Sequence, residues 1–443
     1  MSDRTITICP IGRKQTFVRQ DENRHLSDRT EKERKMKYYI IAGEASGDLH
    51  GSNLMKGLYQ EDPKADVRFW GGGLMNEVYI HNQCQPSSDA KDGTKNCAKG
   101  DGFVHDYKQG AVMGLTDVLK SAGTLLGNLK ACKKDILAWK PDVVILIDYP
   151  GFNFRIAEFA HKAGFKVFYY IAPKVWASRE GRIRKLKKYV DKLYIVFPFE
   201  IPYFDKKGVN YIYKGNPLVD AIDTSNAANE SREEFLQRNR LTNKPIIAML
   251  AGSRTGEIST MMPVLTAFSR KMREIPAYKD YQFIIAGAPS RSMKDYDKYM
   301  DPKDDGVKVL FGQTQNIIRH AEAAVVNSGT ASLETVLLGT PQVVGYIMGS
   351  NLTYNIAKHI VKVKYISLGN LIIDRLAFKE LIQKDCNPDA LVTEVRELIE
   401  NKAYRQQMLD EYACIRKALG GKGASAAVAA SMVQDLSLMI PLR

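Results

Sequence analysis

Long apolar runs are missing from this chain of 443 residues. No run reaches the roughly 18 residues that a membrane-spanning helix needs, so we expect no transmembrane segment. Arg4, Arg13 and Lys14 stand near the start with no long apolar segment behind them, which argues against a secretory signal. With 44% hydrophobic and 26% charged residues, the composition is that of a globular protein, and we expect it in the cytosol.

Cysteine is scarce, and its positions are scattered. The chain contains no CxxC pair and no histidines near a cysteine at metal-ligand spacing. This pattern argues against a structural zinc site and against a disulfide framework, so we expect reduced thiols. We expect neither a metal nor another cofactor. The cysteines are Cys9, Cys84, Cys97, Cys132, Cys386 and Cys414.

Positive charge is in surplus, since 64 lysines and arginines face 50 acidic residues for a net charge of +14. Nucleic acid, an anionic membrane surface and phosphorylated substrates are the three kinds of partner that suit such a surplus. The densest basic stretch, Arg179–Lys192, has helical spacing and faces either solvent or an anion. Because no RRM, KH or helix-turn-helix pattern is present, a nucleic-acid-binding protein is a remote alternative.

Short apolar runs alternate with amphipathic stretches, which is the rhythm of β-α units on a parallel sheet. The polar stretch Asn216–Glu230 divides the runs into two series and is the expected interdomain linker. We therefore predict an α/β fold with two Rossmann-like domains, whose parallel sheets face a central cleft. The expected strands are Tyr38–Ala42, Val143–Ile147, Val167–Ile171 and Leu193–Val196, then Ile246–Leu250, Phe283–Ala286, Val307–Phe311, Ala323–Val326 and Gln342–Tyr346.

The expected domain boundaries follow from these two series. Residues 1–36 are polar and lack sustained periodicity, so we expect a flexible tail. An N-terminal domain at 37–225 and a C-terminal domain at 226–420 follow, and residues 421–443 are expected to form a helix that packs back on the N-terminal domain. Asp89–Gly102 turns to Asp, Lys, Gly and Ser, which predicts a surface loop.

The stretch Asn327–Glu334 follows the buried run Ala323–Val326 and predicts a turn from a strand into a helix. Small residues let the backbone approach an anion closely, and the free N–H groups and positive end of the helix hold it. Glu334 lies about one turn further on, where it can accept hydrogen bonds from the hydroxyls of a sugar. A nucleotide diphosphate meets both needs. The phosphate-holding residues of this turn are Ser328, Gly329 and Thr330.

Two charged residues follow other expected strands. Asp148 ends the strand Val143–Ile147, where a carboxylate beside apolar walls can have a raised pKa and act as a general base; alternatively it is a helix N-cap or a turn aspartate. Arg254 follows the strand Ile246–Leu250 and can reach a diphosphate across a cleft; alternatively it pairs with Glu257 on the surface.

Two further stretches leave two interpretations open. Gly43–Gly51 follows the first strand, and its small residues around Ser46 allow close approach by a ligand; alternatively its glycines only make a turn and Asp48 caps the helix. Leu115–Leu129 is apolar with few charges, which favours core, or a membrane-facing or acyl-binding surface if it is exposed beside basic residues.

Taken together, these stretches resemble the lipid-A-disaccharide synthases, which are glycosyltransferases of the GT-B type. The resemblance runs from about Lys37 to the C-terminus, with the Asp89–Gly102 stretch as an interruption. Several separate motifs in the right order carry it. They are Gly43–Asp48, Ala111–Gly114, Ile147–Asn153, Pro173–Ala177, Gly252–Arg254, Ser328–Glu334 and Tyr365–Leu371.

The resemblance implies an inverting, metal-independent transfer of 2,3-diacylglucosamine from UDP to the 6-hydroxyl of 2,3-diacylglucosamine 1-phosphate, which gives a β-1,6-linked disaccharide. It implies Asp148 as the general base, with Ser46 nearby on the acceptor side. Peripheral attachment to the anionic surface of the inner membrane is also implied, and a homodimer is one option. The implied donor contacts are Arg254, Ser328, Gly329, Thr330, Glu334, Asn370 and Gln383, and the implied acceptor or membrane contacts are Val112, Met113, Leu115 and Trp176.

Two residues depart from the family's pattern. Gly151 stands where many relatives have an aspartate, so Asp148 acts without a carboxylate partner there. Lys174 stands where a small polar residue is common, and it adds a positive charge near a phosphate. The nearest rival function is another GT-B enzyme, either a UDP-N-acetylglucosamine transferase or a 2-epimerase, because its donor turn would look similar.

Overall fold

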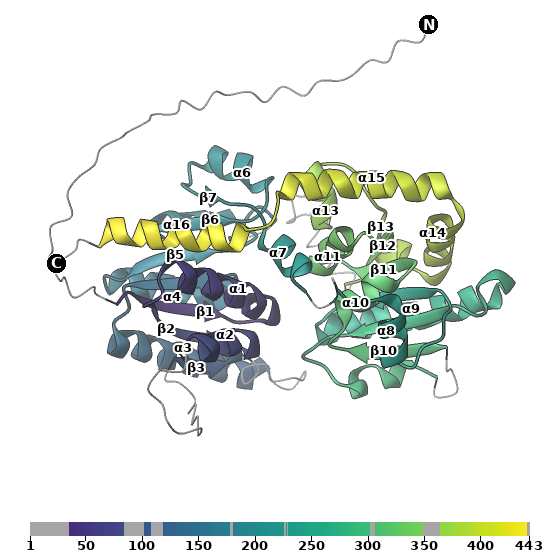
Figure 1. Ribbon diagram of the computed structural model, residues 1–443, viewed down its shortest axis with the longest axis horizontal. Helices are drawn as coiled ribbons and strands as arrows, with labels where there is room; N and C mark the ends of the chain where they lie inside the picture. Colours follow the sequence, from purple (N-terminus) through teal and green to yellow (C-terminus); the bar gives the residue numbers. More distant parts are fainter. Residues whose placement is uncertain are drawn as a thin grey trace, which may run out of the picture. The chain divides into compact units, whose positions relative to one another are not determined.

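The computed structural model describes residues 35–83, 102–107, 118–177, 180–225, 227, 229–301, 306–348 and 364–440. Most of the expected tail and of the Asp89–Gly102 stretch lies outside the described residues, as do Val112, Met113 and Leu115. Residues 36–443 form one compact unit with two parallel sheets, each covered by helices on both faces (Figure 1). This arrangement confirms the α/β fold with two Rossmann-like halves; the domain boundaries given above stay a prediction.

The first sheet has the strand order β3-β2-β1-β4-β5-β6-β7, and its pairings are parallel. The order reverses between β1 and β4, so the turns after these two strands open a crevice at the edge of the sheet. Ser46 and Asp148 lie in or just beyond those turns. The strands are β1 (Lys37–Ala42), β2 (Asp66–Gly71), β3 (Phe103–Asp106), β4 (Val143–Ile147), β5 (Lys166–Tyr170), β6 (Lys192–Ile195) and β7 (Ile212–Tyr213).

The second sheet repeats this plan with the order β10-β9-β8-β11-β12-β13. Its order reverses between β8 and β11, which are followed by the Arg254 turn and by the Ser328–Glu334 turn. The strands are β8 (Ile246–Leu250), β9 (Gln282–Gly287), β10 (Val307–Phe311), β11 (Ala323–Asn327), β12 (Gln342–Tyr346) and β13 (Glu380–Ile382).

Side chains alternate between the two faces of each strand, and both faces are buried. Tyr38 and Ile40 of β1 belong to one apolar cluster, while Tyr39 and Ile41 belong to another on the opposite face. The helices that cover these faces are α1 (Ala45–Glu61), α2 (Gly73–Gln83), α3 (Val118–Trp139), α4 (Pro150–Lys162), α5 (Ile183–Tyr189), α6 (Glu200–Lys207), α7 (Pro217–Asp223), α8 (Arg232–Arg238), α9 (Thr255–Glu274), α10 (Thr314–His320), α11 (Thr330–Leu338), α13 (Leu368–Ile373), α14 (Pro388–Glu400), α15 (Lys402–Leu419) and α16 (Ala424–Met439).

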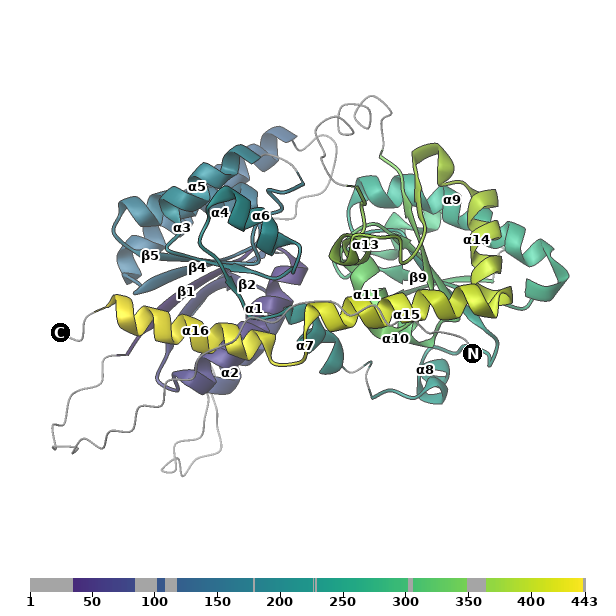
Figure 2. The same cartoon turned by 90° about the horizontal axis from the view of Figure 1, so that it is seen from above.

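The last helix, α16, lies beside α1 of the first half (Figures 1 and 2). A Cβ on Gly57 of α1 would come within 2.7 Å of the Cβ of Ala429, so glycine allows the two helices to approach this closely. Asp435 accepts hydrogen bonds from Lys192 Nζ at 2.7 Å and from the Tyr194 hydroxyl at 3.0 Å. The C-terminal helix is therefore fixed to the first sheet through both apolar and polar contacts.

The expected linker Asn216–Glu230 contains helix α7. Asn216 caps this helix by accepting the Leu218 N–H at 2.9 Å. Asp220 accepts the N–H groups of Gly423 and Ser425, at the start of α16, at 2.6 and 2.8 Å. The segment that connects the two halves is therefore partly helical. Its polar residues Asn216 and Asp220 accept N–H groups at the starts of α7 and α16.

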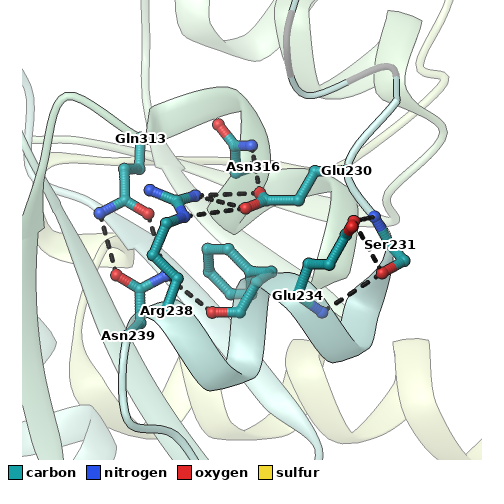
Figure 3. A network of polar contacts seen from close by, with 8 residues as sticks. Glu230, Ser231, Glu234, Arg238, Asn239, Gln313 and Asn316 are labelled. Atoms are coloured by element: carbon teal, nitrogen blue, oxygen red, sulfur yellow. Dashed lines mark hydrogen bonds and ion pairs between the residues drawn. The ribbon is translucent and has the colours of Figure 1, made fainter.

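Helix α8 begins the second half with a capping box, in which Ser231 and Glu234 satisfy each other's backbone N–H groups (Figure 3). The carboxylate of Glu230 accepts hydrogen bonds from Arg238 and from Asn316 of α10, at 2.8 and 2.5 Å. The side chains of Asn239 and Gln313 exchange two more at 2.9 Å. These bonds fix the entry of the chain into the second half.

No helix in the described ranges is both long and apolar enough to cross a membrane.

Candidate active site

A cleft of about 760 Å³ lies between the carboxyl ends of the two sheets. Its walls come from the turns after β1 and β4 on one side and after β8 and β11 on the other. The two crevices that the strand orders create therefore open into one space. Of the residues expected from the sequence, this cleft brings together Ser46, Asp148, Arg254, Ser328, Gly329, Thr330 and Glu334.

Asp148 sits on a strained turn. Asp148 and Tyr149 both have left-handed backbones, with φ of 42° and 47°, which is costly for residues other than glycine. The backbone carbonyl of Asp148 accepts hydrogen bonds from the Tyr169 hydroxyl at 2.6 Å and from Asn153 Nδ2 at 2.7 Å. Asn153 Nδ2 also donates to the carbonyl of Ile147 at 3.2 Å. Two buried side chains thus hold the backbone that carries the carboxyl group.

The surroundings of the Asp148 carboxyl raise its pKa above the usual value, chiefly because burial penalises the charged form. The charges of Lys174 and Arg254 oppose this rise, while the charge of Glu44 adds to it. Tyr149 is the residue that precedes α4, and no side chain caps this helix. The alternative interpretation of Asp148 as a helix cap is therefore not what the structure shows.

Close packing in the first turn requires a glycine. A Cβ on Gly43 would collide with the ring of Tyr149, so Gly43 lets the turns after β1 and β4 meet. Ser46 is exposed on the first turn of α1 and lines the cleft. Asp48 is buried instead and accepts the N–H groups of residues 72, 74 and 75 at 2.9, 3.1 and 3.0 Å. It fixes the start of α2 and does not cap α1.

The turn from β11 into α11 offers an uncapped helix N-terminus to the cleft. Gly329 precedes the helix with φ of 154° and supplies no side-chain cap, so the first N–H groups of α11 stay available to an anion. Ser328 Oγ donates to the carbonyl of Ile366 at 3.1 Å. A Cβ on Gly252, after β8, would collide with the side chain of Asn327. Glycine thus brings the turns after β8 and β11 together.

Glu334 lines the cleft from α11 and is partly buried. Burial alone raises the pKa of its carboxyl to about 7. None of the described residues donates a hydrogen bond to this carboxylate or forms an ion pair with it. A partly buried acceptor without a partner among the described residues suits a ligand that brings hydroxyl donors of its own.

Arg254 both faces the cleft and pairs with Glu257. Its guanidinium lies 3.1 Å from Glu257 Oε1, and its side chain is 72% exposed. The other carboxylate oxygen of Glu257 accepts the N–H groups of Ser253 and Arg254, at 2.9 and 3.1 Å. The two interpretations of Arg254 therefore do not exclude each other, because the pair holds the arginine at the cleft wall.

Arg291 also lines the cleft, although no motif in the sequence predicts it. Its Nε donates to the carbonyl of Ser253 and its Nη1 to Thr255 Oγ1, both at 2.9 Å. It braces the turn that carries Arg254. Its position shortly after the expected strand Phe283–Ala286 is a sequence signal, but that signal does not say that β9 lies beside β8 in the sheet.

An aromatic wall on the first-half side was also unexpected. Trp70 lies 4.3 Å from the ring of His105 and 5.8 Å from that of Phe152, which in turn stacks on Tyr149 at 5.6 Å. All four residues line the cleft. Trp70 Nε1 donates to the Tyr39 hydroxyl at 2.8 Å, which fixes the indole. Such a wall suits an apolar sugar face or an acyl chain.

Three further residues named from the sequence lie outside the cleft lining. The Asn370 amide is buried and bonds to the backbone of Phe378 and to Glu380. Gln383 Oε1 accepts the Met348 N–H at 2.6 Å. Trp176 Nε1 donates to Glu200 at 3.1 Å. The structure does not bring these side chains into the cleft with the other residues for which donor or acceptor contacts are expected, and all these ligand-binding roles stay predictions.

Within the described ranges, no group of three or more His, Cys, Asp or Glu residues is arranged to hold a metal ion.

Comparisons with known proteins agree with this geometry. Residues 92–431 match the family model described as lipid-A-disaccharide synthetase. The lipid-A-disaccharide synthase of Trichlorobacter lovleyi is 32% identical over 405 residues, covering 91% of this chain and 99% of that protein. The corresponding enzyme of Syntrophus aciditrophicus is 35% identical over 387 residues, covering 87% and 94%.

Solved structures of low sequence identity share the fold. S. aureus MnaA with UDP superposes with a TM-score of 0.63 at 14% identity, covering 91% of this chain and 97% of that one. UDP-GlcNAc 2-epimerase from Neisseria meningitidis, bound to UDP-GlcNAc, gives a TM-score of 0.62 at 12% identity, covering 90% and 100%. The two-sheet GT-B architecture expected from the sequence is thereby confirmed.

Proposed function

Because the chain belongs to the lipid-A-disaccharide synthases, which are glycosyltransferases of lipid A biosynthesis, we propose that it joins UDP-2,3-diacylglucosamine and 2,3-diacylglucosamine 1-phosphate. The products are the β-1,6-linked disaccharide and UDP. The observation that carries this proposal is the single cleft, in which a carboxyl with a raised pKa faces an uncapped helix N-terminus and an arginine.

The second-half wall binds the donor. The diphosphate lies at the N-terminus of α11, where free N–H groups and the helix dipole attract it, and Arg254 supplies a full positive charge. The unpartnered carboxylate of Glu334 accepts hydrogen bonds from donor hydroxyls. As the bond from the anomeric carbon to the phosphate oxygen breaks, these groups stabilise the charge that develops on UDP.

The first-half wall activates the acceptor. Asp148 takes the proton of the 6-hydroxyl while the oxygen attacks the anomeric carbon, so one C–O bond forms as the bond to UDP breaks. Attack from the side opposite the leaving group inverts the anomeric centre. Gly151 supplies no second carboxylate, and a Cβ there would meet open space, so Asp148 acts as the base without a partner at that position.

The described part of the apolar stretch Leu115–Leu129 lies on α3, and we propose that this part contributes both to the cleft and to a membrane-facing surface. Leu125 lines the cleft, whereas Leu126 beside it is 66% exposed. Lys130, Lys134 and Leu137 are exposed on the turns that follow. An exposed helix face of leucine and lysine suits the anionic surface in which the acylated substrates reside. We therefore place the enzyme at the cytoplasmic side of the inner membrane.

One experiment tests the proposed reaction directly. Purified protein is incubated with UDP-2,3-diacylglucosamine and 2,3-diacylglucosamine 1-phosphate, and the products are examined by mass spectrometry. We expect the tetraacylated disaccharide monophosphate together with UDP. A second incubation with non-acylated UDP-N-acetylglucosamine distinguishes the rival GT-B functions: its conversion to an epimer or to another glycoside, without the disaccharide in the first incubation, would contradict the proposal.

A further inference from the structure

A lysine without a polar partner among the described residues stands on the first-half wall of the cleft. Lys174 lines the cleft and its side chain is exposed. No described residue forms a hydrogen bond or an ion pair with its ammonium group. Arg254 and Arg291 on the opposite wall, by contrast, are both engaged with the Ser253–Glu257 turn. Lys174 is therefore a cation that is open to a ligand.

The backbone beneath Lys174 is held firmly. Val175, the next residue, is buried, and its carbonyl accepts a hydrogen bond from the Tyr203 hydroxyl at 3.3 Å. Trp176 donates to Glu200 Oε1 at 3.1 Å and packs edge-on against Phe199 at 4.8 Å. These contacts hold the loop backbone next to Lys174 in place, while the ammonium group of Lys174 is not held by any described residue.

A buried carboxylate organises this base. Glu200 is 1% exposed, and its Oε2 accepts the N–H groups of Val196 and Phe197 at 3.1 and 3.0 Å. Its Oε1 accepts the indole N–H of Trp176. Burial raises the pKa of Glu200 to about 7, and these hydrogen bonds and the charge of Lys174 oppose the rise. The Glu200 carboxylate accepts hydrogen bonds from Trp176, Val196 and Phe197, and it does not contact the ammonium group of Lys174.

The charges around Lys174 constrain what it binds. Asp148 and Glu44 are carboxyl groups on the same wall of the cleft, and the charge of Glu44 raises the pKa of Asp148. The charge of Lys174 lowers this pKa and is the strongest of the influences that do so. A phosphate approaching these carboxylates is repelled unless a cation stands beside them. An ammonium group is a compact point charge and is well suited to a phosphate monoester.

We propose that Lys174 binds the 1-phosphate of the acceptor sugar and so selects the phosphorylated acceptor over its dephosphorylated form. This inference rests on the proposed function and adds to it a residue that determines specificity. The two anionic groups then occupy opposite walls: the donor diphosphate lies against α11 and Arg254, and the acceptor phosphate lies against Lys174. The positive charge also offsets the repulsion between that phosphate and ionised Asp148.

The test compares two acceptors in two enzymes. Wild type and Lys174→Gln are assayed with 2,3-diacylglucosamine 1-phosphate and with 2,3-diacylglucosamine. Both are dispersed in a neutral detergent, so that membrane charge does not contribute, and are assayed at pH 8. A charge-assisted hydrogen bond is worth roughly 1.5–3 kcal/mol, so kcat/KM for the phosphorylated acceptor should fall about 10- to 150-fold. With the dephosphorylated acceptor, the two enzymes should differ by less than about twofold, within the spread of neutral surface substitutions.

Three controls accompany the comparison. Lys206→Gln removes an exposed lysine of α6 that does not line the cleft, and it should behave as wild type with both acceptors. Lys174→Arg keeps the charge and should recover most of the lost kcat/KM. The affinity for UDP should be the same in wild type and Lys174→Gln, because the donor diphosphate lies on the opposite wall.

The possible failures are distinguishable. Equal losses with both acceptors would overturn the inference and assign Lys174 to the tuning of Asp148 alone. Unchanged kinetics with both acceptors would overturn it as well. If wild type forms no disaccharide from either acceptor, the proposed function itself fails, and this inference fails with it.

Discussion

The Tyr169 hydroxyl donates a 2.6 Å hydrogen bond to the backbone carbonyl of Asp148, at the first of two consecutive left-handed residues. The ring of Tyr169 is buried, so the bond links a fixed point of the sheet to the turn that presents the carboxyl group. Strained backbone persists only where its surroundings hold it. We therefore expect Tyr169 to act as a positioning residue for Asp148.

Tyr169→Phe should lower kcat about fivefold and leave KM for the donor nearly unchanged. The reason is that the phenyl ring keeps the packing, while the loss of one hydrogen bond, worth roughly 1 kcal/mol, loosens the turn. Steady-state kinetics and a thermal melt check this. A variant with normal kcat but a lower Tm would show that the bond serves stability alone. Asn153→Ala should act in the same direction, because it removes the other donor.

Asp148→Asn should lower kcat by about 100-fold or more, since general-base catalysis is worth 10²–10⁴. UDP affinity, measured by calorimetry, should stay close to wild type, because the donor turn is on the other wall. In wild type the raised pKa moves the acidic limb of the kcat/KM profile above pH 3.8, with activity lost as pH falls through it. A loss of both turnover and UDP binding would point to a structural role.

Glu334→Gln should stabilise the free protein above pH 7. The folded-state pKa of about 7 lies above the usual 4.5, so the wild-type free energy of unfolding falls as pH rises from 4.5 to 7 and is then constant. The variant lacks this loss, and at pH 8 it should be more stable by on the order of 1–3 kcal/mol. Thermal or urea unfolding across pH 4.5–8 measures the difference. Glu200, whose pKa is also raised to about 7, contributes equally to both proteins, so its effect cancels in the comparison.

The same substitution should weaken donor binding. A neutral amide accepts hydrogen bonds less strongly than a carboxylate, so the Kd of the donor should rise about fivefold to tenfold at pH 8. Calorimetry with the donor and with UDP alone reports which part of the ligand Glu334 contacts. A donor affinity equal to that of wild type would exclude Glu334 from the donor site.

Arg291→Ala should reduce UDP affinity about tenfold even if Arg291 does not touch the ligand, because the turn that carries Arg254 loses its brace. Thr255→Val removes only the contact to Nη1 and should cost less. Calorimetric titration with UDP ranks the two variants. Equal affinities in Arg291→Ala and wild type would show that Glu257 alone fixes the turn.

Replacing Leu126 and Leu137 together by serine should weaken binding to vesicles that contain anionic lipid, because both leucines are exposed on α3. Leu376→Ser is the matched control, since Leu376 is 61% exposed but lies far along the chain, after α13. Co-sedimentation with vesicles measures the change. An equal loss in both variants, or none in either, would remove α3 from the membrane-facing surface.

The sequence predicts the parts of the cleft that follow directly from local patterns. Asp148, Arg254 and Glu334 each lie at or near the carboxyl end of a hydrophobic strand, and parallel strands place such residues along one edge of a sheet. The order of the strands in the two sheets determines the other residues of the cleft wall, which local sequence patterns do not predict. Arg291 and His105 reach the cleft only because β9 and β3 lie on the outer sides of β8 and β2, which no local periodicity encodes.

Side-chain partners are the other part that sequence patterns do not determine. Asn370 falls in a family motif, yet its amide is bound within its own segment. Asp48 stands in a glycine-rich turn, yet it bonds to the start of a different helix. Both outcomes depend on which backbone N–H and carbonyl groups the fold brings near, because a buried amide or carboxylate must find partners. A local motif identifies the residue type but not its partner.

The packing of α16 on α1 has a consequence for the order in which the chain is made. The surface of α1 around Gly57 is covered by Ala429, which lies more than 370 residues later in the chain. A ribosome therefore completes the entire second half before the first half can bury this surface. Until α16 is made, that apolar face is open to chaperones and to other nascent chains, and a chain that lacks α16 would keep it open.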